Sequence, residues 1–458
     1  MSVVHEVEVN ITGATHEVGV DQLFFSTTDS RGLIRHSNNV FIELSRYTRE
    51  ELSGAPHNIV RHPEMPGGAF REMWDALKEG RPFAAYVRNL AADGSEYDVF
   101  ATVTPLPDGG YLSVRTRPVC TDLFETACAV YREARRVEDQ ALAQGDSRRL
   151  AAQKGAQRIG DLLKQVGIPS YEDFQNTALP AEVARREKLS AGLPQRPGTD
   201  GELGTMLEAV TAVTAGLDAW MGGQDELAKL SSVLRVAGQG LRETLEDPLL
   251  TERAVSGLDR SDPRVRPLAD LLDLWVQMQG IVGPVAERLA DSLARLDTNS
   301  ARTRFRVALA RLHATITLMF VVEIIDGVGD TQASSQGVPD LIESLAQGLT
   351  EMEQQAQEHR VLAEQVASYI GEVSRMMAIP HQLLMLWTGS ASSRDPDLPE
   401  KATALSEAAS QAVESVGRRL AELDEAAARC QRVEVPADSS GLRDHLERLR
   451  TTVQAVSS

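Results

Sequence analysis

The sequence predicts an α+β domain, a five-stranded antiparallel sheet with short helices, followed by an all-α region of the helical-bundle or coiled-coil type. Two observations lead to this prediction. Large aromatic side chains, which suit a mixed α/β core, gather in the first hundred residues at Phe24, Phe25, Phe41, Phe70, Trp74, Phe83 and Phe100. After Pro118 strand signals nearly vanish, and the apolar residues are mostly Ala, Leu and Val, which is typical of helices.

The first elements are expected to be two strands followed by short helices. Apolar stretches at Leu23–Thr28 and Leu33–Ser37 predict the strands. Asn38 or Asn39 can cap the first short helix, because an Asn side chain accepts a hydrogen bond from a free helical N–H. The pattern at Thr48–Glu51 is a capping box that opens a second short helix.

A longer helix and three more strands complete the predicted domain. The apolar residues of Gly68–Lys78 recur on one side of a helix. Turns at Asp93-Gly94 and Asp108-Gly109-Gly110 are strong hairpin signals between the strands that follow. These strands are expected at Phe83–Leu90, Glu96–Thr104 and Gly110–Arg117. Such a sheet can cover one side of the helices and leave a ligand pocket between the two layers.

The chain is too long for one core, so two or three domains are expected in its 458 residues. We expect a lead-in over residues 1–20, the sheet domain over 21–118, a helical connector over 119–191, a linker over 192–204 and a helical output bundle over 205–458. The linker prediction rests on its Gly and Pro residues.

Apolar seams at heptad-like spacing support the helical bundle. They are Met206–Val210–Val213–Leu217–Trp220, Leu362–Val366–Tyr369–Val373–Met376, Val413–Val416–Leu420–Leu423–Ala427–Cys430 and Leu442–Leu446–Leu449–Val453–Val456. Prolines are expected to divide the helices near positions 248, 263–267, 284, 339, 380, 396–399 and 436. An antiparallel bundle is the main interpretation, a long dimeric coiled coil is the alternative, and a homodimer is expected.

Charge and cysteine content limit the partners and the compartment. The formal net charge of −19 repels polyanions, so neither nucleic acid nor an anionic membrane surface is an expected partner. Three cysteines do not suggest a disulfide scaffold. The apolar run Thr315–Val322 is well short of the roughly 20 residues that span a bilayer, so we expect a buried helix, no membrane span and a cytoplasmic protein.

The run PHNIVRHPEMPGGAFREMWDALKEG at Pro56–Gly80, with STTDSRGLIRHSNNVF before it and YLSVRTR after it, is a specific pattern. It resembles the PAS domain of bacterial aerotaxis receptors over about Phe25–Arg117. The resemblance implies a flavin-binding redox sensor with non-covalent FAD between sheet and helices. The signature itself covers Asn58–Pro66.

The resemblance implies cofactor-binding positions at Asn38, Asn58, Arg61, His62, Trp74 and Phe83. Phe83 stands where the family has a pocket tryptophan, and Glu64 and Glu72 stand where it has aspartates. Residue chemistry leaves two interpretations open for most of them. Asn38 can hydrogen-bond a flavin edge or only cap a helix, and Trp74 can stack on a ring or belong to the core. Arg61 can bind a phosphate or tie the loop to carboxylates.

Other ligands and enzyme classes find less support. The loop lacks the cysteine with which light-sensing PAS domains form a flavin adduct, and spacing singles out none of His36, His57 and His62 as a haem ligand. The sequence contains no phosphate-binding loop, HExxH pattern or GxSxG pattern. We therefore expect a non-enzymatic sensor that relays the state of FAD to a helical region, which binds a partner such as a chemotaxis-type kinase or adaptor. The alternatives are a cofactor-free PAS scaffold and an unrecognised enzyme in the helical region.

Overall fold

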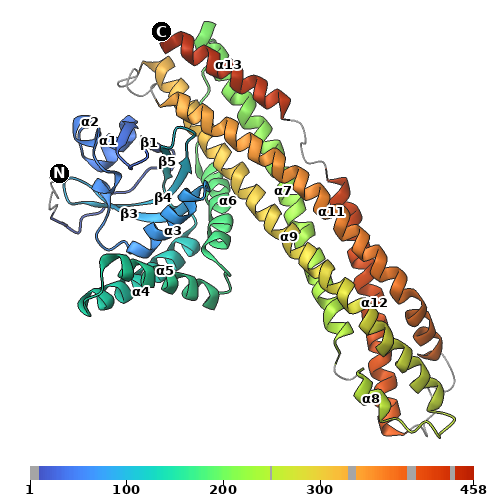
Figure 1. Cartoon of the computed structure of the whole chain (residues 1–458). Helices are drawn as coiled ribbons and strands as arrows, with labels where there is room; N and C mark the ends of the chain where they lie inside the picture. Colours follow the sequence, from blue (N-terminus) through green and yellow to red (C-terminus); the bar gives the residue numbers. More distant parts are fainter. Residues whose placement is uncertain (1–9, 248–249, 328–336, 389–398, 434–438, 458) are drawn as a thin grey trace. The chain divides into compact units, whose positions relative to one another are not determined.

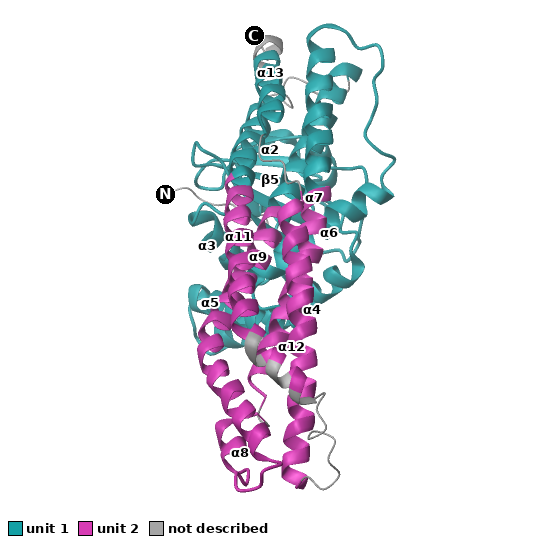
Figure 2. Ribbon diagram, turned by 90° about the vertical axis from the view of Figure 1, so that its right-hand side faces the viewer, with its two compact units in different colours: residues 1–221, 304–353, 438–458 teal, residues 222–303, 354–437 magenta. Residues whose placement is uncertain are grey.

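The computed structural model describes residues 10–247, 250–327, 337–388, 399–433 and 439–457. The first nine residues of the predicted lead-in, and the breaks expected at positions 248, 396–398 and 436, lie outside these ranges. The chain divides into two compact units (Figure 2). Unit 1 comprises residues 1–221, 304–353 and 438–458, and unit 2 comprises residues 222–303 and 354–437.

The N-terminal part of unit 1 contains a five-stranded antiparallel sheet with strand order β2-β1-β5-β4-β3 (Figure 1). The elements in chain order are β1 (Phe24–Thr28), β2 (Ile34–Ser37), α1 (Asn39–Ser45), α2 (Arg49–Leu52), the 3-10 turn η1 (His57–Val60), α3 (Gly67–Lys78), β3 (Phe83–Leu90), β4 (Glu96–Pro105) and β5 (Tyr111–Thr116). The predicted succession of two strands, short helices, a longer helix and a three-strand meander is confirmed.

Local sequence signals produce these elements. Gly94 and Gly109 adopt positive φ angles of 81° and 84° in the two predicted hairpin turns, a conformation that disfavours residues with a Cβ. The side chain of Asn38 accepts a hydrogen bond from the backbone N–H of Phe41 and caps α1. The capping box at Thr48–Glu51 has both of its hydrogen bonds.

Alternate residues of each strand face the helices that cover one side of the sheet. On that face, Ser113 of β5 pairs with Ser26 of β1 and with Val103 of β4. A buried apolar cluster lies in this layer, with Phe24, Phe41, Leu52, Val60, Tyr97 and Val99 among its members. The predicted α+β core therefore forms between sheet and helices, and it borders the cavity described below, which Val60 also lines.

Three helices follow the sheet domain in unit 1. They are α4 (Thr121–Ala143), α5 (Arg148–Gln165) and α6 (Tyr171–Leu189). Helix α5 packs against α3 and α4, and α6 packs against β3 (Figure 1). The outer face of β3 is thereby covered, because Tyr86 contacts the rings of Phe124 on α4 and Phe174 on α6.

The remaining helices are long. They are α7 (Gly201–Leu245), α8 (Glu252–Ser256), α9 (Arg266–Asp326), α11 (Val338–Thr388), α12 (Glu400–Arg432) and α13 (Ser440–Ser457). Most members of the predicted seams are buried, and in unit 2 they belong to one large apolar cluster contributed by α7, α9, α11 and α12. The helical prediction is confirmed, and α7 begins at Gly201, inside the stretch expected to be linker.

Two expected proline breaks are wrong. Pro284 lies inside α9, and α11 continues through Pro380. A proline removes one backbone hydrogen bond and crowds the preceding turn, which costs about 3 kcal/mol or more. A helix of 61 residues such as α9 retains most of its hydrogen bonds and its buried face on both sides of such a position.

The apolar run Thr315–Val322 forms part of α9, as predicted for a buried helix. Within the part of the chain that the structure describes, α9 is the one helix long and apolar enough to cross a membrane. Of its most apolar window, 72% is buried inside the protein, as in a core helix.

Candidate ligand cavity

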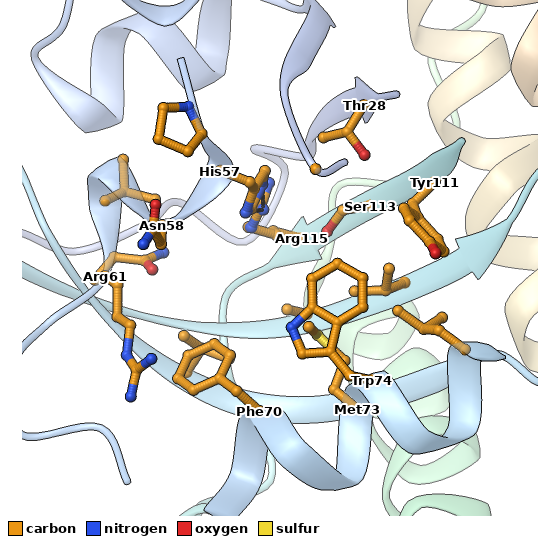
Figure 3. A pocket seen from close by; sticks show the side chains of 18 of the residues that line it. Thr28, His57, Asn58, Arg61, Phe70, Met73, Trp74, Tyr111, Ser113 and Arg115 are labelled. Atoms are coloured by element: carbon orange, nitrogen blue, oxygen red, sulfur yellow. Dashed lines mark hydrogen bonds between the residues drawn. The ribbon is translucent and has the colours of Figure 1, made fainter. Parts of the chain in front are cut away.

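A cavity of about 320 Å³ lies between the sheet and the helical layer (Figure 3). Strands β1, β3, β4 and β5 form one wall, and η1, the loop after it and α3 form the other. Its lining residues include Thr28, Arg31, His57, Asn58, Arg61, Phe70, Met73, Trp74, Val87, Asn89, Val103, Tyr111, Ser113 and Arg115. The pocket predicted between the two layers is therefore present.

Helix α3 supplies the apolar wall. Phe70, Met73 and Trp74 project from it toward β5 (Figure 3), because residues three and four apart share a helix face. Trp74 is half-buried and meets the ring of Tyr111 edge-on, with 5.4 Å between ring centroids. Of the two interpretations of Trp74, the cavity position is the one that the structure favours.

The polar side chains of the cavity are positive or neutral. Arg31, Arg61 and Arg115 line it, together with a histidine and two asparagines, and the described residues of its lining include neither Asp nor Glu. This balance is the reverse of that of the whole chain, in which 66 acidic residues outnumber 47 Lys and Arg residues. The cavity wall therefore favours a ligand that carries negative charge or hydrogen-bond acceptors.

Arg115 is the deepest of the three arginines. Its side chain is 3% exposed, and burial lowers the pKa of Arg115 to about 10. One guanidinium nitrogen donates to the Ser26 hydroxyl at 3.4 Å, and another donates to Nε2 of His57. The guanidinium also lies over the ring of Phe41, with 5.1 Å from its carbon to the ring centroid.

His57 is held in one state by this contact. Arginine has only donors, so Nε2 of His57 accepts the hydrogen bond and the imidazole is neutral. Burial and the neighbouring charge of Arg115 keep the pKa of His57 well below its ordinary value. The Ser26 hydroxyl lies 3.1 Å from the same nitrogen, so strand β1 and turn η1 are joined at the cavity floor.

Arg61 lies nearer the surface. It is half-buried, donates to the backbone oxygen of Met65 at 2.9 Å and lies 4.0 Å from the centroid of the Phe70 ring. Burial lowers the pKa of Arg61. Asn58 lines the same side of the cavity, one turn earlier. The cavity thus brings together three of the predicted residues, Asn58, Arg61 and Trp74.

Asn38 and Phe83 lie outside the cavity lining. The Asn38 side chain accepts from the N–H of Phe25 and donates to the backbone oxygen of Leu23, in addition to capping α1. Phe83 stacks on Tyr171 of α6, with 4.9 Å between ring centroids and 8° between ring planes. The expectation that these two residues face a cofactor is corrected, because their side chains are already engaged by the protein.

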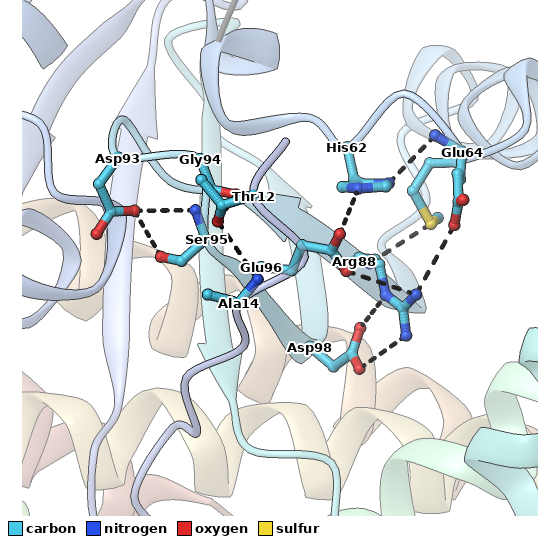
Figure 4. A network of polar contacts seen from close by, with 11 residues as sticks. Thr12, Ala14, His62, Glu64, Arg88, Asp93, Gly94, Ser95, Glu96 and Asp98 are labelled. Carbon is cyan, nitrogen blue, oxygen red and sulfur yellow. Dashed lines mark hydrogen bonds and ion pairs between the residues drawn. The ribbon is translucent and has the colours of Figure 1, made fainter. Parts of the chain in front are cut away.

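His62 also lies outside the cavity lining, in a polar network (Figure 4). Its Nδ1 accepts from the N–H of Glu64, and its Nε2 lies 3.3 Å from a Glu96 carboxylate oxygen. Arg88 joins the network through Glu64 and Glu96, each at 3.8 Å. Arg88 also donates to Asp98 at 2.9 Å, and this hydrogen bond raises the pKa of Arg88. His62 therefore helps to fix the loop that carries Arg61, and it does not line the cavity.

Sequence reasoning missed the polar row on β5. Tyr111, Ser113 and Arg115 line the cavity at every second position, as strand geometry requires. Arg115, a charge between Val114 and Thr116 in an otherwise uncharged strand, was the available signal. The partner of Arg115, His57, comes from a distant turn and could not be deduced from local pattern.

The sheet domain that contains the cavity is also the part of the chain that is similar to known proteins. A family model described as the PAS fold matches residues 34–114. The aerotaxis receptor of Escherichia coli (strain K12) is 45% identical over 101 residues, which are 21% of this chain and 20% of the receptor. This part of the chain is a PAS domain of the aerotaxis-receptor type. The nitrogen fixation regulatory protein of Klebsiella pneumoniae is 28% identical over 81 residues, 18% of this chain and 16% of that protein. The chain thus spans about a fifth or less of the length of these relatives.

Two solved structures are also similar to part of the chain. A fungal LOV-domain photoreceptor is 21% identical with a TM-score of 0.19, covering 24% of this chain and 81% of that chain. The blue-light activated histidine kinase EL346 of Erythrobacter litoralis is 13% identical with a TM-score of 0.21, covering 34% of this chain and 50% of that chain. The assignment of the PAS domain rests on the family model and on the aerotaxis receptor.

The cavity residues of the PAS domain fit a flavin. An aromatic and apolar wall faces a polar strand, and the buried hydroxyl of Ser113 has no hydrogen-bond partner among the described residues. A planar ring can place its apolar faces against the aromatic and apolar wall and its polar edge against the polar strand. Within the described ranges, no cluster of three or more His, Cys, Asp or Glu residues that could hold a metal ion occurs.

Two buried carboxylates join the PAS domain to the helices that follow it. Glu138 of α4 accepts hydrogen bonds from the N–H groups of Gly67 and Gly68, both at 2.7 Å, at the start of α3. Glu182 of α6 accepts from the Tyr86 hydroxyl at 2.7 Å and from the N–H groups just before α4. The cavity helix α3 and the first connector helix are therefore mechanically linked.

Proposed function

We propose that the PAS domain binds FAD non-covalently and senses redox state or oxygen, and that the helices relay this state to a partner protein. The cavity wall is the observation that carries the proposal: three arginines, an apolar side formed by α3, and no carboxylate among the described lining residues. FAD would supply an electron-accepting ring and a negatively charged diphosphate. The resemblance to aerotaxis receptors supports the same ligand.

Cavity size and burial suggest how the residues would divide the ligand. A volume of about 320 Å³ is near the lower end of the roughly 300–1,000 Å³ typical of small-molecule pockets. It suits one fused ring system and not a whole dinucleotide. Trp74 and Phe70 would contact the ring, whereas exposed Arg31 and half-buried Arg61 would attract phosphates at the mouth.

The relay would use the contacts of α3 and β5. A change in ring charge or position would shift the side chains of Trp74 and Phe70, and α3 is tied to α4 through Glu138. The chain also runs directly from β5 into α4, whose start is held by Glu182. A ligand that binds two packings of these helices with different affinity shifts their populations.

Purification of the full chain tests the ligand. We expect a yellow protein with flavin absorption bands, from which heat or acid releases FAD that chromatography identifies. Arg61→Ala and Trp74→Ala should each lower the flavin content, because they remove a charge at the mouth and the ring contact. Arg71→Ala is the matched control, since Arg71 lies on α3 outside the cavity lining and pairs with Asp75.

A colourless full chain that also takes up no added FAD would refute the flavin proposal and would favour the cofactor-free scaffold. Equal flavin content in all three variants would refute the assignment of the site. A non-enzymatic output, homodimerisation, cytoplasmic location and binding of a chemotaxis-type kinase or adaptor remain predictions. Turnover of nucleoside triphosphates by the purified chain would contradict the first of these.

A further inference from the structure

Arg115 is a buried cation without a carboxylate partner among the described residues. Its hydrogen bonds go to a serine hydroxyl and a neutral imidazole, and its faces meet the aromatic rings of Phe24 and Phe41. Burying a charge is costly unless other groups compensate it. The described partners are neutral, so the charge of Arg115 is available to a ligand.

The guanidinium cannot swing away to find another partner. His57 and Ser26 hold two of its nitrogens, and strand β5 fixes its backbone between β1 and β4. Ser113 lies two residues earlier on the same face and carries a buried hydroxyl without a partner in the described part of the chain. Two donors, one of them charged, therefore point from β5 into the cavity (Figure 3).

We propose that Arg115 and Ser113 form a subsite for the acceptor edge of a planar heteroaromatic ring and that the subsite binds the ring more tightly when it is negatively charged. This proposal rests on the flavin proposal and adds the orientation of the ring. A ring edge fits better than a phosphate, because Arg115 is 3% exposed and flanked by aromatic faces. The more exposed Arg31 and Arg61 are better placed for hydrated phosphates.

The subsite has a redox consequence. When an added reductant such as dithionite gives the bound ring two electrons, and the ring takes one proton from solvent, one negative charge stays on the ring. Arg115 stabilises that charge more than it stabilises the neutral oxidised ring. Loss of the guanidinium therefore weakens binding of both forms and weakens the reduced form more. For each factor of ten by which the affinity for the reduced ring falls more than the affinity for the oxidised ring, the midpoint potential of the bound ring falls by about 30 mV.

The test uses the full chain with Arg115→Met and Arg115→Lys, and Arg71→Met as a matched control. Affinities for riboflavin, FMN and FAD are measured by titration, and the midpoint potential of the FAD complex by spectroelectrochemistry. We expect Arg115→Met to weaken all three ligands equally, by roughly 10- to 100-fold, as for loss of a hydrogen bond to a charged group. Arg115→Lys should recover part of both the affinity and the potential.

The outcomes separate the two proposals. Equal affinities and potential in wild type and Arg115→Met would overturn the subsite and leave the flavin proposal standing. A loss confined to FMN and FAD would show that Arg115 binds phosphate and would overturn the subsite as well. A wild-type chain that binds none of the three flavins would overturn both. If Arg115→Met does not fold, Arg115→Lys decides: a lowered affinity for riboflavin together with a lowered potential supports an edge contact, and wild-type affinity and potential refute it.

Discussion

Glu138 offers the sharpest test of the link between the cavity and the connector helices. Its carboxylate is 2% exposed and accepts two hydrogen bonds of 2.7 Å from the first N–H groups of α3, for which no side-chain cap exists within the helix. Hydrogen bonds to a charged group contribute about 1.5–3 kcal/mol each. Glu138→Ala should therefore destabilise the start of α3 by about 3 kcal/mol or more, even where water replaces the carboxylate in part.

Hydrogen exchange measures this effect at the right place. A loss of 3 kcal/mol makes local opening roughly 100-fold more frequent, so the amides of α3 should exchange about that much faster in Glu138→Ala. Glu138→Gln keeps one acceptor oxygen, so its α3 amides should exchange at rates between those of the wild type and Glu138→Ala. Glu133→Ala is the control on the same helix, because Glu133 makes an exposed ion pair with Arg136 worth less than about 1 kcal/mol. Unchanged exchange of the α3 amides in a folded Glu138→Ala protein would contradict the conclusion that Glu138 holds the start of α3.

Two glycines of α5 give a second test of the position of Glu138, because alanine should lower the melting temperature at one of them and raise it at the other. A Cβ at Gly155 would lie 1.9 Å from a Glu138 oxygen, whereas one at Gly160 on the same helix meets nothing within 4 Å. Ala in place of Gly inside a helix ordinarily stabilises by about 0.5–1 kcal/mol. Gly160→Ala should thus raise the melting temperature, and Gly155→Ala should lower it. A raised melting temperature for both would exclude the close approach.

Two further predictions concern buried polar groups. Tyr86→Phe removes the hydroxyl that donates to buried Glu182. Calorimetry should show that the free energy of unfolding of unit 1 falls by about 1–3 kcal/mol. No change would mean that water or another donor replaces the hydroxyl. Burial lowers the pKa of His313 to about 3 from its ordinary value of 6.5. As the pH falls, His313 is therefore protonated in the unfolded chain before it is protonated in the folded chain. The stability that neutral His313 contributes is complete above about pH 6.5 and is lost toward pH 3, with about 2 kcal/mol lost by pH 5. His313→Gln should flatten this part of the pH profile of the melting temperature, and an unchanged profile would refute the assignment.

Local chemistry made the PAS elements predictable from the sequence. Turn glycines, the Thr48–Glu51 capping box and strand alternation act within a few residues, so their signals are readable without the fold. The same holds for the apolar seams of the long helices, most of whose members are buried. The proline rule failed at Pro284 and Pro380, because a local penalty was outweighed by the rest of a long helix.

Membership of the site was decided by tertiary contacts. Of the residues that the sequence indicated, Asn58, Arg61 and Trp74 line the cavity, since one loop and one helix face carry all three. Asn38 and Phe83 were matched by resemblance, but their side chains are engaged elsewhere, one as a cap and the other on α6. Sequence alone could not decide between these roles, because each residue suits both.

The sequence by itself determined that a sheet and helices form a layered domain with a pocket, and that helices follow it. Only the tertiary structure decided that Arg115 of β5 meets His57 of η1 and that Glu138 caps α3 from another helix. The physical reason is the range of the interactions. Hydrogen bonds between residues 58 and 71 positions apart depend on how strands and helices pack, and that packing leaves no periodic signal in the chain.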